Sequence, residues 1–178
     1  MGLDSVEFVL GVEEAFQLAI PDADAERMLT PRDVVEYISA RLGPVSSRVC
    51  LEQRAFYRLR RAVVRVFGVP RSQVLPTTRW EDLLPPGDRK HHWLLVHQAT
   101  GTPQWPSLTF WRHRFPSSVE TVGGTAAHLA EVAAGALRGD EGLTRDQIER
   151  TVRTLMREHL GVKEFDWNDQ FVRDLNVD

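Results

Sequence analysis

The sequence contains a single cysteine, Cys50, and no run of apolar residues long enough to cross a bilayer. One cysteine excludes an internal disulfide and a zinc ribbon, which needs several cysteine ligands. A transmembrane helix needs about 20 consecutive apolar residues, and the N-terminus also lacks the basic-then-apolar order of a signal peptide. We therefore expect a cytoplasmic protein with no membrane partner.

Motifs of catalysis and metal binding are also scarce. The six histidines show neither the HExxH spacing nor cysteine partners, and no serine lies in a nucleophile elbow. The pair Gly123-Gly124 lacks the strand context and the lysine of a phosphate-binding loop. The sequence therefore predicts a protein that is not an enzyme and has no metal site.

An aromatic and basic stretch, residues 93–115, has a composition that suits stacking on single-stranded nucleic acid. We prefer a different interpretation, in which Trp93 and Trp105 fill a small core and nearby prolines shape the connections. Nucleic acid is therefore not the expected partner.

Charges of opposite sign are concentrated in different parts of the chain. Residues 1–44 hold nine acidic and three basic side chains, residues 45–140 hold seven and thirteen, and residues 141–178 hold nine and six. Two acidic ends thus flank a basic middle. This pattern favours docking of the acidic ends on the basic middle, or an acidic partner for the middle. The alternative is that the solvated faces differ only in the sign of their charge.

Apolar periodicity predicts two helices near the N-terminus. The first has apolar residues at three- and four-residue steps and outward-facing glutamates at 7, 13 and 14; the apolar positions are Leu3, Val6, Val9, Val12 and Phe16. The second begins after Thr30, a good N-cap, with Pro31 at the first helical position. Its apolar residues are Val34, Val35, Ile38 and Leu42, and Gly43-Pro44 ends it.

The C-terminal segment predicts one more amphipathic helix followed by a loop. The apolar positions of this helix are Ile148, Val152, Leu155 and Leu160. Gly161 stands at a C-cap-like position, where a left-handed residue commonly ends a helix. The loop then passes through Phe165, Trp167 and Phe171 to Asp174-Leu175.

The middle of the chain repeats this order, which predicts a second, degenerate copy. A helix with apolar residues at 56, 59, 63 and 67 ends at Gly68, and a loop leads to Trp80-Glu81-Asp82-Leu83. Gly68 precedes Asp82 by 14 positions, and Gly161 precedes Asp174 by 13. Farther on, Thr121-Val122-Gly123 corresponds to Thr30-Pro31-Arg32.

Joined end to end, the two termini contain a recognisable motif. Residues 174–178, Asp-Leu-Asn-Val-Asp, followed by residues 2–7, Gly-Leu-Asp-Ser-Val-Glu, resemble the prosthetic-group loop of acyl carrier proteins, Asp-Leu-Gly-x-Asp-Ser-Leu. The resemblance implies an all-α protein with a four-helix bundle assembled, in permuted order, from residues 1–44 and 142–178. It implies a degenerate carrier-like helical domain at 52–134. We favour a closed monomer over a swapped dimer, in which two molecules exchange halves.

In the acyl carrier family, a serine at a helix N-terminus is esterified by 4′-phosphopantetheine, whose thiol holds an acyl group. The resemblance makes Ser5 the candidate attachment residue, with Gly2, Asp4 and Asp178 around it. In a second register, which aligns without a gap, Gly2 occupies the attachment position and Asp178 precedes it. We favour this register for the structure, because it places Leu3 inside the helix. Asp4 is alternatively an N-cap, with Glu7 completing a capping box.

The resemblance also implies partners. A phosphopantetheinyl transferase would load Ser5, and acyl-handling enzymes of fatty acid or polyketide biosynthesis would dock on the acidic helix, at Glu7, Glu13 and Glu14. In the alternative, a serine-less interaction or regulatory scaffold binds such enzymes or another carrier protein, using the basic residues Arg58, Arg61 and Arg65. The middle copy has Arg89 where a serine would follow Gly87-Asp88, so no arm is expected there.

Overall fold

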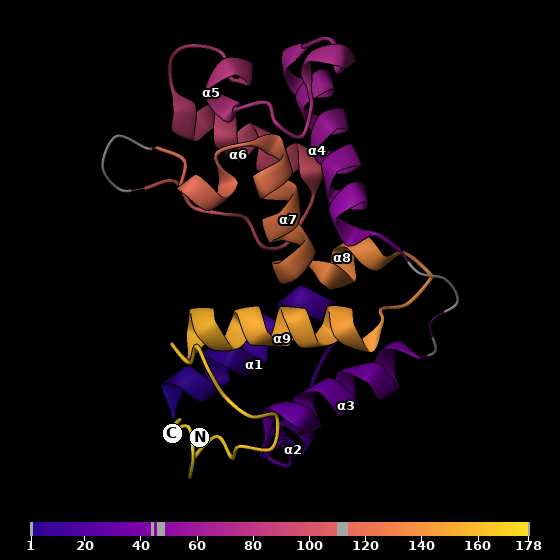
Figure 1. Ribbon diagram of the computed structural model, residues 1–178, viewed down its shortest axis with the longest axis vertical. Coiled ribbons are helices and arrows are strands. Elements are labelled where there is room, and N and C mark those ends of the chain that lie inside the picture. Colours follow the sequence, from indigo (N-terminus) through magenta and orange to yellow (C-terminus); the bar gives the residue numbers. More distant parts are fainter. Residues whose placement is uncertain (1, 44, 46–48, 110–113, 178) are drawn as a thin grey trace. The chain divides into compact units, whose positions relative to one another are not determined.

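The computed structural model describes residues 2–43, 45, 49–109 and 114–177, and these residues form helices and loops with no named strand (Figure 1). The predicted all-α class is therefore confirmed. None of the described helices is both long and apolar enough to span a membrane. In chain order the elements are α1 Leu3–Phe16, α2 Asp22–Ala25, α3 Pro31–Leu42, α4 Leu51–Phe67, η1 Arg71–Gln73, α5 Trp80–Leu83, α6 Arg89–Thr100, η2 Ser117–Val119, α7 Val122–Val132, α8 Ala134–Arg138 and α9 Arg145–His159.

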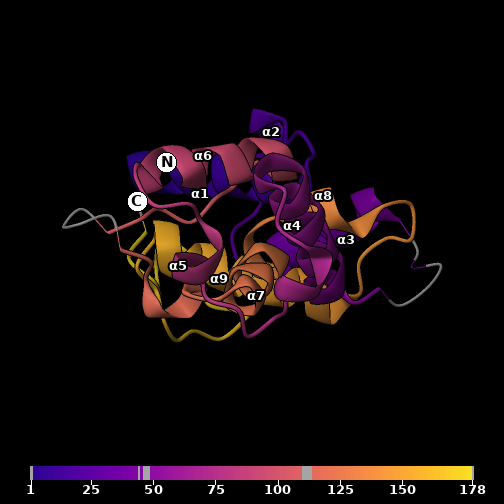
Figure 2. The same cartoon turned by 90° about the horizontal axis from the view of Figure 1, so that it is seen from above.

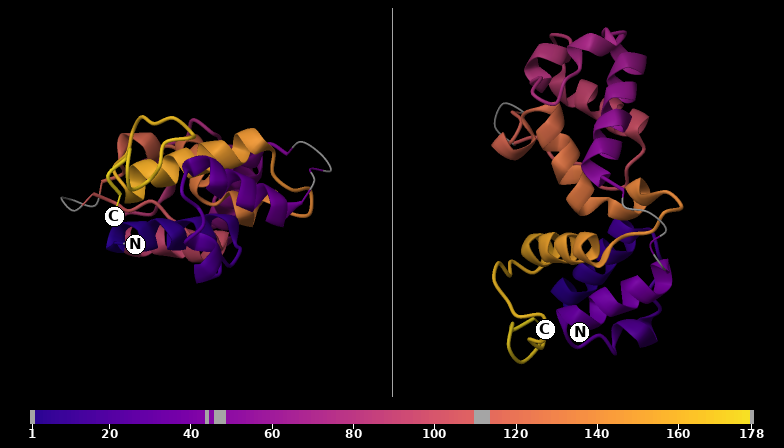
Figure 3. Two further views of the ribbon diagram at one scale, coloured as in Figure 1. Left: turned by 90° about the horizontal axis from the view of Figure 1, so that it is seen from below. Right: turned by 45° about the vertical axis from the view of Figure 1, so that its right-hand side comes forward.

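The chain divides into two compact units. The terminal unit comprises Met1–Val49 and Glu131–Asp178, and the middle unit comprises Cys50–Ala130. The sequence predicted domain limits of 1–44 with 142–178 and of 52–134, whereas α8 here lies in the terminal unit. Both ends of the chain thus contribute to one unit, and Figure 3 shows the first helix beside the C-terminal loop.

In the terminal unit, α1 and α3 pack against α9, and α1 also packs against α8. The buried side chains come from all three long helices and include Phe16, Val35, Ile38, Ile148 and Leu155. Two glycines allow close approach. A Cβ on Gly11 would lie 2.6 Å from His159 Nε2, and one on Gly135 would overlap the backbone carbonyl of Phe16.

The buried face of α1 differs from the predicted one. Val12 and Phe16 are buried as predicted, but Leu3 and Val6 are 73% and 42% exposed, and Phe8, Gly11 and Ala15 complete the buried set. Each three-residue step turns only about 300° around a helix, so the predicted series drifts steadily away from a single face. The observed set alternates steps of three and one, which keeps it on one side.

The helix ends agree with the sequence where a local signal marks them. Thr30 caps α3 as predicted, and its capping box includes Asp33, whose backbone N–H donates to Thr30 Oγ1 over 3.2 Å. Gly68 ends α4 in the left-handed conformation with φ 66°, and Gly161 follows α9 with φ 68°. Left-handed glycine satisfies the last carbonyl groups of a helix at no steric cost, which explains why these ends were predictable.

In the middle unit, α4 packs against α6 (Figures 1 and 2). Aromatic side chains, among them Trp80, Trp93 and Phe115, contribute to the core of this unit. Trp80 is fully buried, and its ring centroid lies 5.0 Å from that of Trp93. The indole Nε1–H of Trp93 donates to the Pro106 carbonyl over 2.8 Å. Trp105 is half-buried and stacks on His97 with centroids 5.0 Å apart. Trp93 and Trp105 therefore both belong to the packing of this unit.

Two backbone hydrogen bonds join the long loop of the terminal unit to Leu29 and to the first turn of α3. The N–H of Phe171 donates to the Leu29 carbonyl over 3.0 Å, and the N–H of Arg32 donates to the Trp167 carbonyl over 2.9 Å. The two loop residues, Trp167 and Phe171, are thus four positions apart. The two residues to which they bond, Arg32 and Leu29, are three positions apart. The bonds fix the loop against the start of α3.

The middle unit contains the same pair of bonds with the same spacing. The N–H of Trp80 donates to the Glu120 carbonyl over 3.1 Å, and the N–H of Gly123 donates to the Pro76 carbonyl over 2.8 Å. Here too the two loop residues, Pro76 and Trp80, are four positions apart, and the two residues to which they bond, Gly123 and Glu120, are three positions apart. The two units therefore share this local structure in detail.

The threonines that precede α3 and α7 also correspond. Thr121 Oγ1 accepts from the N–H of Gly124 over 3.0 Å, as Thr30 Oγ1 accepts from Asp33. In each case the donor is the third residue of the helix. The sequence similarity between 30–32 and 121–123 thus corresponds to one capped helix start present twice in the chain.

Candidate ligand-binding site

Ser5 lies in the first turn of α1, as the third helical residue. Gly2 is the N-cap, and the Ser5 hydroxyl donates to the Gly2 carbonyl over 2.9 Å. Since Gly2 is the N-cap, the alternative in which Asp4 caps the helix and Glu7 completes a capping box is wrong. The helix includes Leu3, as the gapless register expects, although the Leu3 side chain is exposed.

An apolar cavity of about 250 Å³ lies in the terminal unit beside this turn. Its wall includes Ser5, and residues from both ends of the chain complete it. They come from α1 (Phe8, Val9, Val12), from the segment between α1 and α3 (Ile20, Ala25, Glu26, Met28, Leu29), from α3 (Val34), and from the C-terminal loop with the residue after α9 (Leu160, Gln170, Phe171, Val172, Val177).

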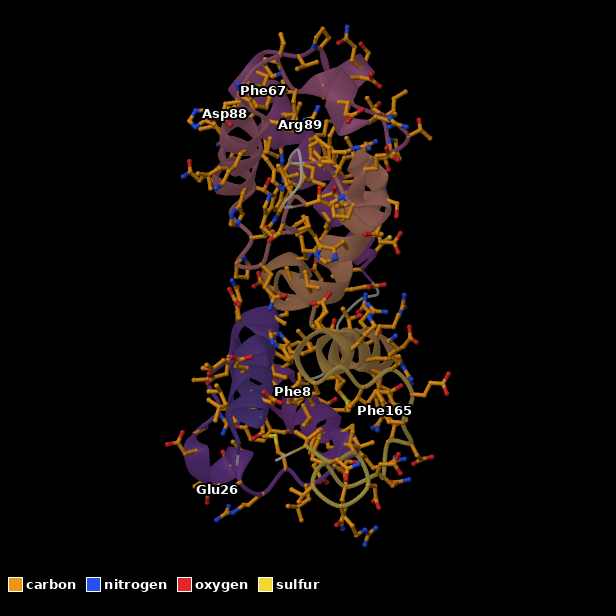
Figure 4. The ribbon with its side chains drawn as sticks, turned by 90° about the vertical axis from the view of Figure 1, so that its left-hand side faces the viewer. Phe8, Glu26, Phe67, Asp88, Arg89 and Phe165 are labelled. Carbon is orange, nitrogen blue, oxygen red and sulfur yellow. The ribbon has the colours of Figure 1, made fainter. Side chains whose placement is uncertain are left out.

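The walls of this cavity are fixed by packing and by backbone hydrogen bonds. The ring centroids of Phe8 and Phe171 lie 5.7 Å apart. The N–H of Val177 donates to the Phe171 carbonyl over 2.8 Å, so the last turn of the chain closes onto the wall. Figure 4 shows Phe8 within the terminal unit and Glu26 at its outer edge, beside α2.

The chemistry of the cavity suits an apolar group. Ser5, Glu26 and Gln170 are its polar members, and the other lining residues are aliphatic or aromatic. At roughly 30 Å³ per water molecule, the volume corresponds to about eight water-sized groups. An apolar lining offers ordered water few hydrogen-bond partners, so an aliphatic chain is a better occupant than water.

The loop before the chain end holds part of the motif in a defined turn. The Asp174 carboxylate accepts from the Gln170 N–H over 2.9 Å and from Arg173 Nε over 3.0 Å. The hydrogen bond from Arg173 is the main reason that the pKa of Asp174 lies below its usual range. Asn176 has φ 53° and lies in the left-handed region. Asp178, a predicted neighbour of the attachment position, lies outside the described residues.

The three glutamates predicted to contact partners differ in their surroundings. Glu7 and Glu14 are exposed on α1. Glu13 is half-buried, and its Oε1 accepts from the Ile20 N–H over 2.6 Å, so it fixes the turn after α1. The expectation that Glu13 points outward is therefore wrong, because an unpaired backbone N–H in that turn takes its carboxylate as a partner.

The predicted basic residues lie on α4 in the middle unit. Arg61 and Arg65 line a surface groove, whereas Arg58 is half-buried outside its lining. Burial lowers the pKa of the Arg58 guanidinium, and the nearby charges of Arg61 and Arg54 lower it further. The acidic and basic candidates thus belong to different units.

No metal centre is evident in the part of the chain that the structure describes, where no three His, Cys, Asp or Glu side chains are grouped suitably. His113, with its neighbours at 110–112, lies outside that part. Comparison with models of known protein families found no match, and comparison with solved protein structures found none either.

Sequence reasoning missed most of the cavity wall. Met28, Leu29 and Val172 belong to no periodic pattern, so the sequence did not predict a role for them. One signal was available, because Met28 and Leu29 are adjacent apolar residues in the otherwise polar connection 21–30 and are therefore candidates for a tertiary contact. Only the fold shows that the C-terminal loop supplies that contact.

Proposed function

We propose that this protein is a non-catalytic, acyl-carrier-like protein in permuted order, whose terminal unit carries an acyl group on 4′-phosphopantetheine or mimics such a carrier. The observation that supports this most directly is the apolar cavity with Ser5 on its wall at the start of α1. A helix start offers free backbone N–H groups and a positive dipole end to a phosphate. The adjacent cavity offers an apolar environment to an acyl chain.

The conformation of Asn176 also supports the resemblance. In the motif Asp-Leu-Gly-x-Asp-Ser-Leu, the glycine position corresponds to Asn176 in residues 174–178. Asn176 has φ 53°, a conformation that glycine adopts freely and asparagine tolerates better than most residues. The backbone here thus has the form that a glycine in the family motif would suit.

The shared hydrogen bonds of the two units support a duplicated carrier-like design. Each unit ties a loop to a threonine-capped helix start by the same two backbone bonds. In the middle unit the helix after this loop begins at Arg89, capped by Asp88, whose carboxylate accepts from the His91 N–H. We therefore assign any prosthetic group to the terminal unit alone.

Loading of Ser5 is the primary test of this function. A broad-specificity phosphopantetheinyl transferase and coenzyme A should add one phosphopantetheinyl group to the full chain, as measured by intact mass. In that step the Ser5 Oγ–P bond forms, the diphosphate P–O bond of coenzyme A breaks, and adenosine 3′,5′-bisphosphate leaves with release of a proton. Ser5→Ala should abolish the addition, and Ser72→Ala, which removes an exposed serine of the middle unit, should not.

An unmodified wild-type mass, with a known carrier loaded in the same reaction, would reject the arm on Ser5. A mass increase that persists in Ser5→Ala would reject it equally, because the group would then be on another residue.

The cavity gives an independent prediction. A fluorescent medium-chain fatty acid should bind the full chain, and Val9→Phe should weaken binding at least tenfold because the added ring fills the cavity. Val66→Phe, at a half-buried position of α4 outside this cavity, is the matched control and should bind as wild type does. Equal affinity of Val9→Phe and wild type would show that the fatty acid binds elsewhere.

One observation favours a second candidate function, a serine-less interaction or regulatory scaffold. Gly2 is the N-cap of α1, and the Ser5 hydroxyl already donates a hydrogen bond to the Gly2 carbonyl. If Gly2 stands at the attachment position, the fold retains the carrier's docking surface without its arm. Acyl-handling enzymes or another carrier protein are then the proposed partners, the latter on the arginines of α4.

A further inference from the structure

The middle unit presents a groove lined by four arginines. The groove has a volume of about 490 Å³ and is formed by α4 together with η1; its lining residues are Tyr57, Arg60, Arg61, Val64, Arg65 and Arg71. Positions 57, 60, 61, 64 and 65 recur at steps of three and four, so they share one face of α4. Arg71 adds a guanidinium from the next element along the chain.

The positive charge of this groove is not balanced by neighbouring carboxylates. Across the described residues, none of its four arginines forms an ion pair, and the single acid of α4 is Glu52 in the first turn. The printed sequence gives the whole middle unit eleven basic and five acidic side chains. Of these acids, Glu81 and Glu120 pair with Arg79 and Arg89 instead.

Two of the guanidinium groups are held in place by the protein backbone. Arg60 Nε donates to the Val74 carbonyl over 3.0 Å, and its Cζ lies 4.4 Å from the ring centroid of Phe56. Arg65 Nη2 donates to the Ala99 carbonyl over 2.8 Å. A guanidinium has five N–H donors, so each keeps most of its donors for a ligand after this anchoring. Preorganised arginines lose less conformational entropy when they bind an anion.

The ligand that fits these groups has two neighbouring phosphates. Guanidinium groups bind phosphate oxygens in bidentate geometry. The positive charge of four arginines exceeds the negative charge of a single phosphate group. Tyr57, which is 42% exposed at the same groove, offers a flat aromatic face for a heterocycle. We propose that this groove binds a diphosphate-bearing ligand of the chemical class of a nucleoside 5′-diphosphate. This inference goes beyond the carrier function and does not depend on it.

Calorimetric titration of the full chain with ADP, inorganic pyrophosphate and adenosine tests the proposal. ADP and pyrophosphate should bind saturably and adenosine should not, and both affinities should fall as salt is raised. Arg61→Gln with Arg65→Gln should weaken both at least tenfold. The control, Arg157→Gln with Lys163→Gln, removes two exposed charges from the terminal unit and should change neither affinity more than about twofold.

A single variant outside α4 keeps the test decisive if the double variant fails to fold. Arg71→Gln should weaken ADP binding severalfold while the circular dichroism spectrum stays that of wild type. Tyr57→Ala should weaken ADP but not pyrophosphate if the natural ligand is a nucleotide, and equal effects on both would assign the groove to free polyphosphate. Absence of saturable binding by either anion would overturn the proposal. So would equal losses in the two double variants, or binding of oligonucleotides that tightens with their length.

Discussion

Gly135→Ala should lower the free energy of unfolding of the terminal unit by about 3 kcal/mol. The added Cβ would overlap the carbonyl group of Phe16 and lie 2.6 Å from its Cα. These are backbone atoms at the end of α1, so relief requires α8 to move away from α1 as a whole. Alanine is favoured over glycine within a helix by up to about 1 kcal/mol, which reduces the loss without reversing it.

Gly11→Ala is the matched control for this prediction. Its Cβ would also meet an atom at short range, His159 Nε2 at 2.6 Å, but that atom ends a side chain that can rotate. The loss in free energy of unfolding should therefore be less than half that of Gly135→Ala. Urea denaturation combined with hydrogen exchange of peptides from α1 and α9 measures both. A loss in Gly135→Ala no larger than in Gly11→Ala would show that α8 does not pack on α1 as described.

Trp80→Ala should destabilise the middle unit by about 3 to 5 kcal/mol. Trp80 is fully buried, and its ring packs against Trp93 at 5.0 Å and Phe115 at 6.4 Å. Its indole Nε1–H donates to Thr125 Oγ1 over 2.8 Å. The substitution therefore leaves a large cavity and also removes a buried hydrogen bond.

Two comparison variants separate these contributions. Trp80→Phe keeps a ring but loses the hydrogen bond, so its cost should be intermediate, about 1 to 2 kcal/mol. Trp167→Ala removes a half-buried indole from the terminal loop, where it lies under the Arg153 guanidinium, and should cost less than Trp80→Ala. Hydrogen exchange of α4 and α6 peptides should accelerate most in Trp80→Ala, less in Trp80→Phe, and not in Trp167→Ala. Unchanged exchange there would place Trp80 outside the core of this unit.

The elements that the sequence predicted well are those with local signals. Thr30 and Pro31 mark the start of α3 because a hydroxyl acceptor and a fixed φ act within one turn of the helix. Gly68 and Gly161 mark helix ends because their left-handed conformation is a property of the residue itself. No distant partner is needed for any of these effects, so the local sequence was sufficient to predict them.

The candidate sites were only partly predictable. The sequence singled out Ser5 and its neighbours, and the structure adds the apolar cavity, whose wall joins α1 to Phe171 and Val177. It also singled out Arg58, Arg61 and Arg65 as one group. In the structure Arg61 and Arg65 line a groove, and Arg58 lies outside its lining. Arg71, from η1, completes that groove, and the periodicity of α4 does not report a residue outside the helix.

By itself, the sequence determined the all-α class, the caps of α3 and the ends of α4 and α9, and the repeat of Thr30-Pro31-Arg32 at Thr121-Val122-Gly123. These features depend on interactions within a few residues, where side-chain type fixes the backbone outcome. Only the tertiary structure decided which face of α1 is buried, why Gly135 must be glycine, and how two remote ends line one cavity. Each of these depends on contacts between segments more than 100 residues apart, whose packing no local pattern specifies.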